Sequence, residues 1–355
     1  MLIIRPVALS DLDDLIELAK MASFGLTTLP RDRELLSDRI ALSEKNFEFE
    51  PQKPQGELYI FVMEDLDSAK VVGTSLIVSK VGGFDPFYAF RLETCLNESA
   101  HLKIRKELSY LRLLKEHNGP TEIGGLFLAP NYRKHGAGRL MSLFRFLFMA
   151  DRRPQFESVV IAEMRGVADE AGRSPFWEAV GSHFFDMNYE KADYLSLTDK
   201  RFIGELMPRS PLYVCLLPRE AQEVIGKVHE NTKPALKMLR DEGFKFNHMV
   251  DIFDAGPMVA CPLDDIRVVK DSVLAVVENL SSSTIQSSAY IIATVGKVFR
   301  SCVGTVCRTP SGGAIIEVGV AETMGINIGD FIRFSPLRPA NSLGQKVQEP
   351  KQRFP

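Results

Sequence analysis

Short apolar runs separated by turn residues predict strands in the first half of the chain. The runs at 2–7, 58–65 and 71–81 are rich in β-branched and aromatic residues, and a short polar turn joins the last two. Runs of this length and composition are typical of strands, so we predict a single strand followed by a β-hairpin. Two further runs, at 122–130 and 158–166, predict strands that flank a long helix.

The segment 139–150 has helical rather than alternating spacing. Five apolar residues recur at steps of three and one, which places them on one helical face: Leu140, Leu143, Phe144, Leu147 and Phe148. Other apolar residues extend that surface around the helix: Met141, Phe146 and Met149. We therefore predict that this helix is buried.

Capping residues predict three shorter helices. Ser10 precedes an apolar stripe, and Ser174 with Pro175 is a typical helix start. Pro234 and Gly243 have the positions expected near the start and after the end of a third helix, which a strand then follows. The second and third helices both precede aromatic residues, which suggests two related half-domains with a boundary near 195–215.

The composition changes after Pro257. Short β-branched runs then alternate with glycine and serine turns, which predicts a small all-β domain over residues 258–338. We expect residues 1–257 to form the main α+β region. The polar, proline-containing residues 339–355 predict a loose tail.

Composition and charge exclude several classes of protein. The chain has 355 residues, 45% of them apolar and 25% charged, with a net charge of -3 and no basic block. Nucleic acid is therefore not the expected partner. The five cysteines form no C-x-x-C pair, which favours free thiols in a reducing cytoplasm. No apolar run has the length of a membrane helix, and the opening residues turn acidic too early for a secretory signal.

Two glycines lie between a predicted strand and the buried helix. Gly136 and Gly138 follow the basic residues Arg133 and Lys134, with His135 and Ala137 completing the loop. The loop is either an ordinary turn or a cradle for a phosphate. Because glycine lets backbone amides approach a ligand, and a helix start carries partial positive charge, we interpret the loop as a pyrophosphate site.

The same residues carry a resemblance to known families. Arg133-x-x-Gly136-x-Gly138, after a strand and opening a helix, resembles the acyl-CoA pyrophosphate loop of the GNAT superfamily of N-acetyltransferases. A narrower resemblance covers most of the chain. Several motifs, in the same order, are similar to those of the arginine N-succinyltransferase family: GLTTLP at 25–30, AEMRG at 162–166, GRSPFWEAVGSHFF at 172–185, ELMPRSPLY at 205–213, VIGKVHENTKPA at 224–235 and DIFDAGP at 251–257.

The resemblance implies an acetyltransferase-like mixed sheet flanked by helices. It also implies transfer of succinyl from succinyl-CoA to the α-amino group of L-arginine, the first step of an arginine-degrading pathway. Succinyl-CoA would be a co-substrate, with no tightly bound cofactor. The segment 88–122 departs from the family pattern, which leaves ornithine or another small amine as an alternative acceptor. A non-catalytic acyl-CoA-binding partner subunit is a third alternative.

The chemistry of acyl transfer suggests roles for particular residues. A thioester carbonyl that becomes an oxyanion needs backbone donors. In an acetyltransferase-like fold the strand before the phosphate loop supplies one, and we select Leu126, with Phe127 and Leu128 beside it. The resemblance implies that His229 is the proton donor to the leaving thiolate. We assign His183 and His248 to packing or the surface, and because the histidines lack metal-binding spacing we expect no metal.

The acceptor needs partners for its charged groups. Glu163 and Arg165 fall on one face of a predicted strand, and we prefer them as substrate-binding residues. Arg165 alternatively serves the free carboxylate of the succinyl group. Nearby acidic residues have surface ion pairs as their ordinary interpretation: Asp169, Glu170, Asp251 and Asp254. We expect either a homo-oligomer or pairing with a paralogous subunit.

Overall fold

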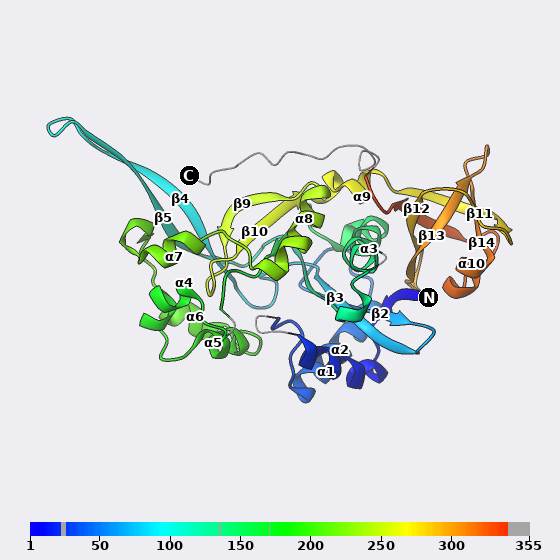
Figure 1. Cartoon of the computed structure of the whole chain (residues 1–355), viewed down its shortest axis with the longest axis horizontal. Coiled ribbons are helices and arrows are strands. Elements are labelled where there is room, and N and C mark those ends of the chain that lie inside the picture. The colour runs from blue at the N-terminus through cyan, green and yellow to red at the C-terminus, as the bar shows by residue number, and fades with distance from the viewer. Residues whose placement is uncertain (23–25, 135, 170, 340–355) are drawn as a thin grey trace.

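The computed structural model describes residues 1–22, 26–134, 136–169 and 171–339, which form a long mixed sheet with helices on its faces (Figure 1). The described strands are β1 (Leu2–Pro6), β2 (Leu58–Asp65), β3 (Lys70–Val78), β4 (Phe87–Ser99), β5 (Ile104–Glu116), β6 (Thr121–Leu128), β7 (Val159–Glu163), β8 (Leu212–Tyr213), β9 (Lys245–Val250), β10 (Pro257–Pro262), β11 (Val273–Ser281), β12 (Ala289–Thr294), β13 (Ser301–Arg308), β14 (Ala314–Glu317) and β15 (Phe331–Pro336). The described helices are α1 (Leu12–Met21), α2 (Arg33–Glu48), α3 (Ala137–Asp151), α4 (Pro175–Ala179), α5 (Tyr189–Leu195), α6 (Arg201–Leu206), α7 (Arg219–Val224), α8 (Lys233–Asp241), α9 (Arg267–Lys270) and α10 (Val318–Met324).

The strands join in the order β12-β15-β11-β14-β13-β1-β2-β3-β6-β7-β10-β9-β4-β5-β8. Among the paired strands of the described residues, only β6 with β7 and β11 with β14 run parallel. The expected α+β class, a mixed sheet flanked by helices, is confirmed. None of the helices in the ranges given above is both long and apolar enough to cross a bilayer.

Local patterns predicted most of the central elements correctly. β2 and β3 form the expected antiparallel hairpin, and α3 is buried along nearly its whole length. The Ser174 hydroxyl accepts a hydrogen bond from the Trp177 amide at the start of α4, as expected of a cap. Ser10 does not cap α1, however. A 3-10 turn precedes that helix, and the Asp11 carboxylate instead accepts the Ala8 amide.

Alternate residues of β2 serve two helical layers. Tyr59 and Phe61 belong to the apolar core around α3, whereas Ile60 and Val62 belong to the core beneath α1 and α2. A strand that is buried on both faces has a continuous apolar run, which explains the unbroken pattern of this segment. The sheet therefore separates an α3 layer from an α1–α2 layer.

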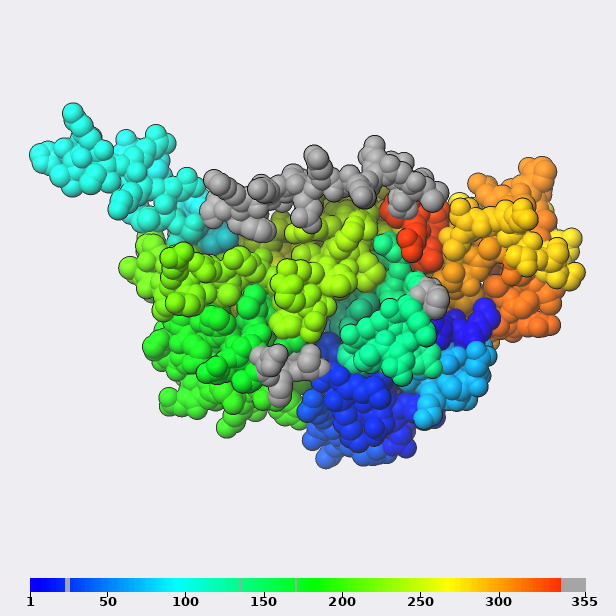
Figure 2. Space-filling view, in the orientation of Figure 1, coloured from blue at the N-terminus to red at the C-terminus, as the bar shows by residue number. Residues whose placement is uncertain are grey.

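The segment 88–122 forms most of a long β-arm. β4 and β5 have 13 residues each and pair in register from Phe87↔Glu116 to Ser99↔Ile104. Other strands reach only the inner part of the arm, where β4 pairs with β9 and β5 pairs with β8. Figures 1 and 2 show its outer part projecting away from the body of the protein.

Strands β11–β15 pair with one another at the opposite end of the sheet from the arm. They join the remaining strands where Ile4 of β1 lies opposite Ser301 of β13. β10, which falls within the predicted 258–338 domain, pairs with β7 and β9 instead. We therefore propose that the C-terminal β region begins at β11. The predicted tail, apart from Pro339, lies outside the described residues.

The two helix-then-strand elements proposed as a repeat differ in the structure. α8 leads through Gly243 into β9, as expected. After α4, however, the chain forms a 3-10 turn at Gly181–His183 and continues into α5, without a strand over these described residues. This difference removes the observation on which the suggestion of two half-domains rested.

Candidate active site

A fork between two strands marks the centre of the candidate site. β6 and β7 run parallel, and their pairing joins Thr121 to Val160 and Glu122 to Ile161. No further residue pair joins the described lengths of these strands. Toward their carboxyl ends the two strands therefore leave a gap in the ladder, where an extended ligand can reach backbone groups.

A β-bulge in β6 accompanies the fork. The register with β3 shifts between the pairs Thr74↔Phe127 and Leu76↔Gly124, so one extra residue is inserted at Gly125–Leu126. Gly125 has φ +59°, and a Cβ there would lie 2.9 Å from the Leu76 side chain, so glycine is required. A bulge leaves the backbone groups of its extra residue outside the ladder. Leu126, the predicted oxyanion donor, lies at this position.

The bulge also changes which face of β6 each residue occupies. Ile123 and Leu128 both pack in the core around α3, although an odd number of positions separates them. Phe127 packs instead beneath α1 and α2. Glu122, one residue before Ile123, consequently lies on the α1–α2 side of the sheet. The other predicted residues of this strand end, Phe127 and Leu128, thus have opposite orientations.

The glycine loop connects the fork to the start of α3. Gly136 has φ +84°, the left-handed region that favours glycine, and Ala137 is the first helical residue. A Cβ added at Gly138 would meet nothing within 4 Å, so open space adjoins the first helical turn. His135 lies outside the described residues. The start of this buried, fifteen-residue helix therefore offers backbone amides and partial positive charge to an anion.

Only part of the loop backbone is available to a ligand. The amides of Arg133, Lys134 and Ala137 donate to the carbonyls of Pro130, Tyr132 and Lys134, respectively, so these donors are used within the loop. The amides of the first helical turn have no carbonyl one turn earlier in the helix. The amides of Gly138 and Arg139, in the first helical turn, are therefore better candidates for binding an anion than those of Arg133, Lys134 and Ala137.

The two basic residues of the loop differ in how they are held. Arg133 Nε donates to the Leu128 carbonyl over 2.9 Å, and its guanidinium lies 5.5 Å from the centre of the Phe127 ring. Arg133 thus ties the loop to the end of β6. Lys134 is exposed. Its charge adds to the positive potential at the helix start without holding the loop together.

A buried arginine beneath the fork was missed by the sequence analysis. Arg145 lies on α3, and its side chain bonds to the Ser142 carbonyl and hydroxyl and to the Gly124 carbonyl next to the bulge. Burial lowers the pKa of Arg145 to about 9. The polar residue in an otherwise apolar helix was the available signal. Its charge lies below the strand that would meet the thioester.

Two carboxylates lie on the other face of the fork. Glu122 lies opposite Ile161 in the parallel pairing, and Glu163 follows two residues later on the same face. The Glu122 Oε1 atom lies 3.6 Å from the position that a Cβ would occupy at Gly124, so this side chain extends along β6. Glu163 retains exposed surface, but surrounding protein raises its pKa well above the usual value, and the charge of Glu122 adds to that shift.

His229 lies beside the chain that continues from Glu163. Its backbone amide donates to the Arg165 carbonyl over 2.9 Å, and its Nδ1 accepts the Asn231 amide over 3.1 Å. Desolvation, and then the charge of Arg165, lowers the pKa of His229. The imidazole is therefore neutral at pH 7, and because Nδ1 acts as an acceptor, the ring proton is on Nε2.

Arg165 lies beyond the end of β7, so the period-two argument that paired it with Glu163 does not extend to it. Burial, and then the charges of Asp251 and Asp254, raise the pKa of Asp193 well above its usual value, and the charge of Arg165 opposes that rise. Arg165 therefore interacts with an acidic residue of α5 as well as with His229.

The aspartates of the DIFD motif hold the loops around Arg165 and His229. Asp254 is buried, and it accepts the amides of Gly166 and Gly256 over 2.7 Å each. Tyr189 of α5 donates to the same carboxylate over 3.3 Å. Burial raises the pKa of Asp254 to about 7, and Asp251 adds to that shift. Asp254 thus positions these segments.

The remaining predicted residues have ordinary environments. Asp169 forms a 2.8 Å ion pair with the exposed Arg173, and Glu170 lies outside the described residues. His183 is part of the 3-10 turn after α4, and His248 is exposed, with its ring 5.2 Å from that of Phe246. Within the described residues, no three His, Cys, Asp or Glu side chains are placed to hold one metal ion.

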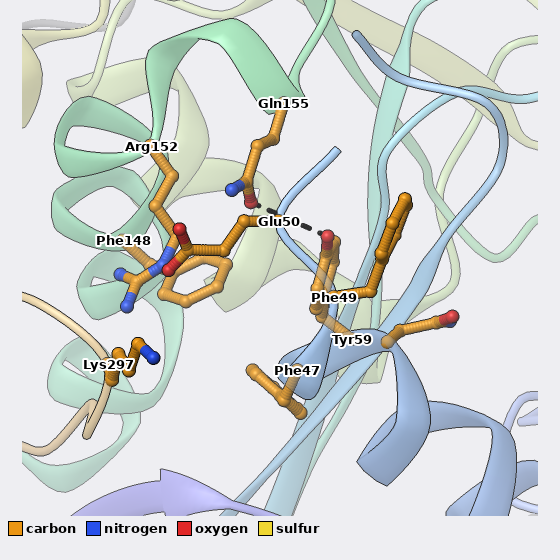
Figure 3. A pocket seen from close by; sticks show the side chains of 9 residues that line it. Phe47, Phe49, Glu50, Tyr59, Phe148, Arg152, Gln155 and Lys297 are labelled. Atoms are coloured by element: carbon orange, nitrogen blue, oxygen red, sulfur yellow. Dashed lines mark hydrogen bonds between the residues drawn. The ribbon is translucent and has the colours of Figure 1, made fainter. Parts of the chain in front are cut away.

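A pocket at the other end of α3 is too small for a substrate. Figure 3 shows Arg152 beside the Phe148 ring, with its guanidinium carbon 4.4 Å from the ring centre. The Tyr59 hydroxyl donates to Gln155 over 3.5 Å in the same pocket. The cavity measures about 10 Å³, room for no more than a water molecule. This cavity is therefore not a candidate for the substrate site.

Comparison with known proteins assigns the family. Residues 2–268 match the model of the family described as "Arginine N-succinyltransferase beta subunit". The chain is 41% identical over 340 residues to "Arginine N-succinyltransferase subunit beta" of Pseudomonas aeruginosa, covering 95% of this chain and 98% of that protein. It is 48% identical over 275 residues to "Arginine N-succinyltransferase" of Yersinia pestis, covering 77% and 78% of the two chains.

A solved structure agrees with this assignment. The arginine/ornithine succinyltransferase subunit AI of Pseudomonas aeruginosa superposes with a TM-score of 0.87 at 33% identity, covering 96% of this chain and 99% of that one. The chain therefore belongs to the arginine N-succinyltransferase family, and the resemblance described from its motifs is confirmed.

Proposed function

We propose that this protein transfers the succinyl group of succinyl-CoA to the α-amino group of L-arginine, as the first step of arginine degradation. The observation that carries the proposal is the β6–β7 fork, which opens at the start of α3 in a chain of this family. We further propose that succinyl-CoA is a co-substrate and that the enzyme acts in the cytoplasm.

The first turn of α3 would bind the pyrophosphate of the co-substrate. The amides of Gly138 and Arg139 and the charge of Lys134 suit an anion there. The chain carrying the thioester would then follow the fork toward the bulge. At that point the Leu126 amide is suited to stabilise the oxyanion that forms when the amine attacks the carbonyl carbon.

His229 would assist departure of the thiolate. A neutral imidazole with its proton on Nε2 donates a hydrogen bond to the developing negative charge on sulfur. The bond from the Asn231 amide to Nδ1 holds the ring in the required tautomer. Asp254 supports this arrangement, because it accepts the Gly166 amide next to Arg165, whose carbonyl holds the His229 backbone.

Ornithine is a second candidate acceptor. The structurally similar subunit AI from Pseudomonas aeruginosa is described as an arginine/ornithine succinyltransferase. In this chain the divergent segment 88–122 forms the β-arm, whose outer part projects away from the fork. Its departure from the family pattern therefore gives no specific reason to exclude arginine.

Assembly with another subunit is also proposed. Two relatives carry the word subunit in their descriptions, which supports pairing with a paralogous chain or with a second copy. A non-catalytic role for this chain is less well supported, since the fork, the glycine loop and His229 occur together in it.

Release of free CoA thiol tests the function. We expect thiol release when the protein, succinyl-CoA and L-arginine are mixed, with an equimolar product that has gained one succinyl group by mass spectrometry. Thiol release with ornithine but not with arginine would show that ornithine is the acceptor. Tight CoA binding without release, for any of these amines, would contradict an enzymatic role.

A further inference from the structure

Two buried polar atoms without hydrogen-bond partners lie on the α1–α2 side of the sheet, the side that Glu122 faces. The Thr28 hydroxyl and the Nε of Arg39 are both buried, and neither finds a partner among the described residues. The Thr28 oxygen lies 3.2 Å from the position that a Cβ would occupy at Gly125, directly beside the bulge. Buried polar groups are nearly always satisfied, so two orphans near one site indicate a missing ligand.

The charges of Arg39 and Glu122 act on each other. Burial lowers the pKa of Arg39, whereas Glu122 opposes that shift. Conversely, burial raises the pKa of Glu122, and the charges of Lys200 and Arg39 oppose the rise. Lys200 acts on Glu163 in the same way. Opposite charges therefore interact at the fork. The positive charges come from α2 and from the residue before α6, and the negative charges come from the two fork strands.

These groups lie on the face of the sheet from which an acceptor would approach. Val160 and Ala162 of β7 pack in the core around α3, so Glu163, which alternates with them, faces the other side. The phosphate cradle belongs to α3 on the first side. A thioester held in the fork therefore presents its carbonyl between the co-substrate side and the charged group.

We propose that Thr28, Arg39, Glu122, Glu163 and Lys200, here called the head-group site, bind the α-amino-acid head of the acceptor. Arg39 and Thr28 take the α-carboxylate, and the carboxylates of Glu122 and Glu163 take the α-ammonium, with Lys200 balancing their charge. This assignment rests on the proposed function, and it deepens that function by defining the acceptor as an amino acid with a free carboxylate.

The arrangement also supplies the proton acceptor that the reaction needs. The α-ammonium gives one proton to the Glu122–Glu163 pair, and the neutral amine then attacks the thioester carbonyl carbon to form the C–N bond. Collapse of the tetrahedral intermediate breaks the C–S bond. The second nitrogen proton ends on the thiolate sulfur, so the products are an amide, a thiol and one proton that the carboxylate pair returns to water.

Arg39 and Thr28 could bind either of two carboxylates, the α-carboxylate of the acceptor or the free carboxylate of the succinyl group. The acceptor's α-carboxylate fits better, because a single carbon separates it from the ammonium group. An α-amino acid thus presents adjacent opposite charges, as the head-group site does with Arg39 beside Glu122. The succinyl carboxylate of the donor has no neighbouring positive group that would occupy the two glutamates.

Assays with acceptor analogues show whether the bound carboxylate belongs to the acceptor or to the donor. Thiol release is measured with L-arginine, with argininamide, whose carboxyl group is uncharged, and with agmatine, which lacks it. We compare the wild type with Arg39→Gln, Arg39→Lys and the nearly isosteric Thr28→Val. Arg33→Gln is the matched control, since Arg33 is an exposed arginine on the same helix, 2.7 Å from Asp13.

If the head-group site is correct, substitutions in it should lower kcat/KM only for acceptors that have a carboxylate. Arg39→Gln should lower kcat/KM for L-arginine about ten- to a hundredfold, the value of a hydrogen bond to a charged group, and leave agmatine nearly unchanged. Arg39→Lys should restore part of the loss, and Thr28→Val should give a smaller loss of the same selectivity. Arg33→Gln should leave the ratio between the two acceptors unchanged.

Other outcomes overturn the assignment. Equal losses on L-arginine and agmatine would make Arg39 a structural residue. A loss that distinguishes succinyl-CoA from acetyl-CoA, rather than one acceptor from another, would assign the carboxylate to the donor. Calorimetric binding of L-arginine and agmatine provides a readout without turnover. Suppose that the wild type binds L-arginine without turnover, and that Arg39→Gln loses this binding. The proposed function would then fail, whereas the head-group site would stand.

Discussion

Arg145 donates a hydrogen bond from Nη1 to the carbonyl oxygen of Gly124 over 3.3 Å, so a buried cation on α3 holds the β-bulge that opens the fork. The rest of the guanidinium bonds to Ser142 on the same helix. Arg145 is 3% exposed, which removes solvent screening. A cation in this position both fixes the bulge and favours negative charge on a thioester oxygen in the fork.

Replacing Arg145 should affect catalysis more than folding. Arg145→Met removes the bond to the bulge and the nearby charge, so we expect kcat to fall at least about tenfold, with a small change in KM for succinyl-CoA. Removing this buried charge relieves its desolvation cost, which offsets the hydrogen bonds lost to Ser142 and Gly124, so the urea midpoint should change little. Arg240→Met, at an exposed position of α8, is the control. An unchanged kcat in Arg145→Met would show that Arg145 does not contribute to catalysis.

The glycine loop should tolerate no side chain at Gly136. Gly136→Val forces a β-branched residue to φ +84° at the start of α3, which displaces the amides that would bind pyrophosphate. We expect the Kd for CoA, measured by calorimetry, to rise at least about tenfold. Gly312→Val is the matched control, because Gly312 has φ +91°, no atoms near its Cβ position and a place remote from the fork in the C-terminal β region. Equal CoA affinity of both variants would contradict the cradle.

His229 should act as a neutral hydrogen-bond donor. His229→Ala is expected to lower kcat about a hundredfold or more, whereas His229→Gln, which retains an N–H donor, should recover part of that loss. His183→Ala, at an exposed histidine, tests whether loss of another imidazole has this effect, and we expect full activity. Full activity of His229→Ala in steady-state assays would exclude the proton-donor role.

The pH dependence should report the glutamate pair. Desolvation by the surrounding protein, and then the charge of Glu122, raises the pKa of Glu163, with Asp251 and Asp254 adding to the rise and Lys200 opposing it. Because the carboxylate must be ionised to accept a proton, kcat/KM should increase as pH rises through this elevated pKa. Glu122→Gln removes the neighbouring charge, so the pKa of Glu163 should fall.

Profiles of kcat/KM against pH for the wild type and Glu122→Gln measure this effect directly. The ascending limb of the variant should lie at lower pH, even if its maximum rate is reduced. Glu116→Gln, at an exposed glutamate ending β5, controls for general changes in charge. An ascending limb at the same pH in all three proteins would show that the charge of Glu122 does not affect the pKa of the group that limits the rate.

Elements governed by local patterns were predictable from the sequence. α3 and the β2–β3 hairpin follow directly from their apolar spacing, and the cap at Ser174 follows from its side-chain chemistry. The segment after α4 was not predictable in this way. Its aromatic residues suggested a strand, but tertiary packing forms a 3-10 turn there, and Phe185 stacks on Trp177 with ring centres 5.5 Å apart.

Only part of the candidate site could be read from the sequence. The glycine loop and Leu126 could be proposed from the sequence because residues that are neighbours in the chain form them. Arg39, Glu122 and Lys200 are far apart in the chain, and only the folded structure brings the charges of Arg39 and Lys200 close enough to affect the pKa of Glu122. No local spacing marks such a convergence. Pairing Glu163 with Arg165 assumed a strand that continues through both, whereas β7 ends at Glu163.

A crystal structure of the protein with CoA and L-arginine tests the central claim most directly. We predict that the pyrophosphate contacts the amides of Gly138 and Arg139, that the thiol lies in the β6–β7 fork beside Leu126, and that the amino acid lies on the α1–α2 face. A nucleotide bound away from the start of α3, or a fork filled by side chains with CoA elsewhere, would contradict the account.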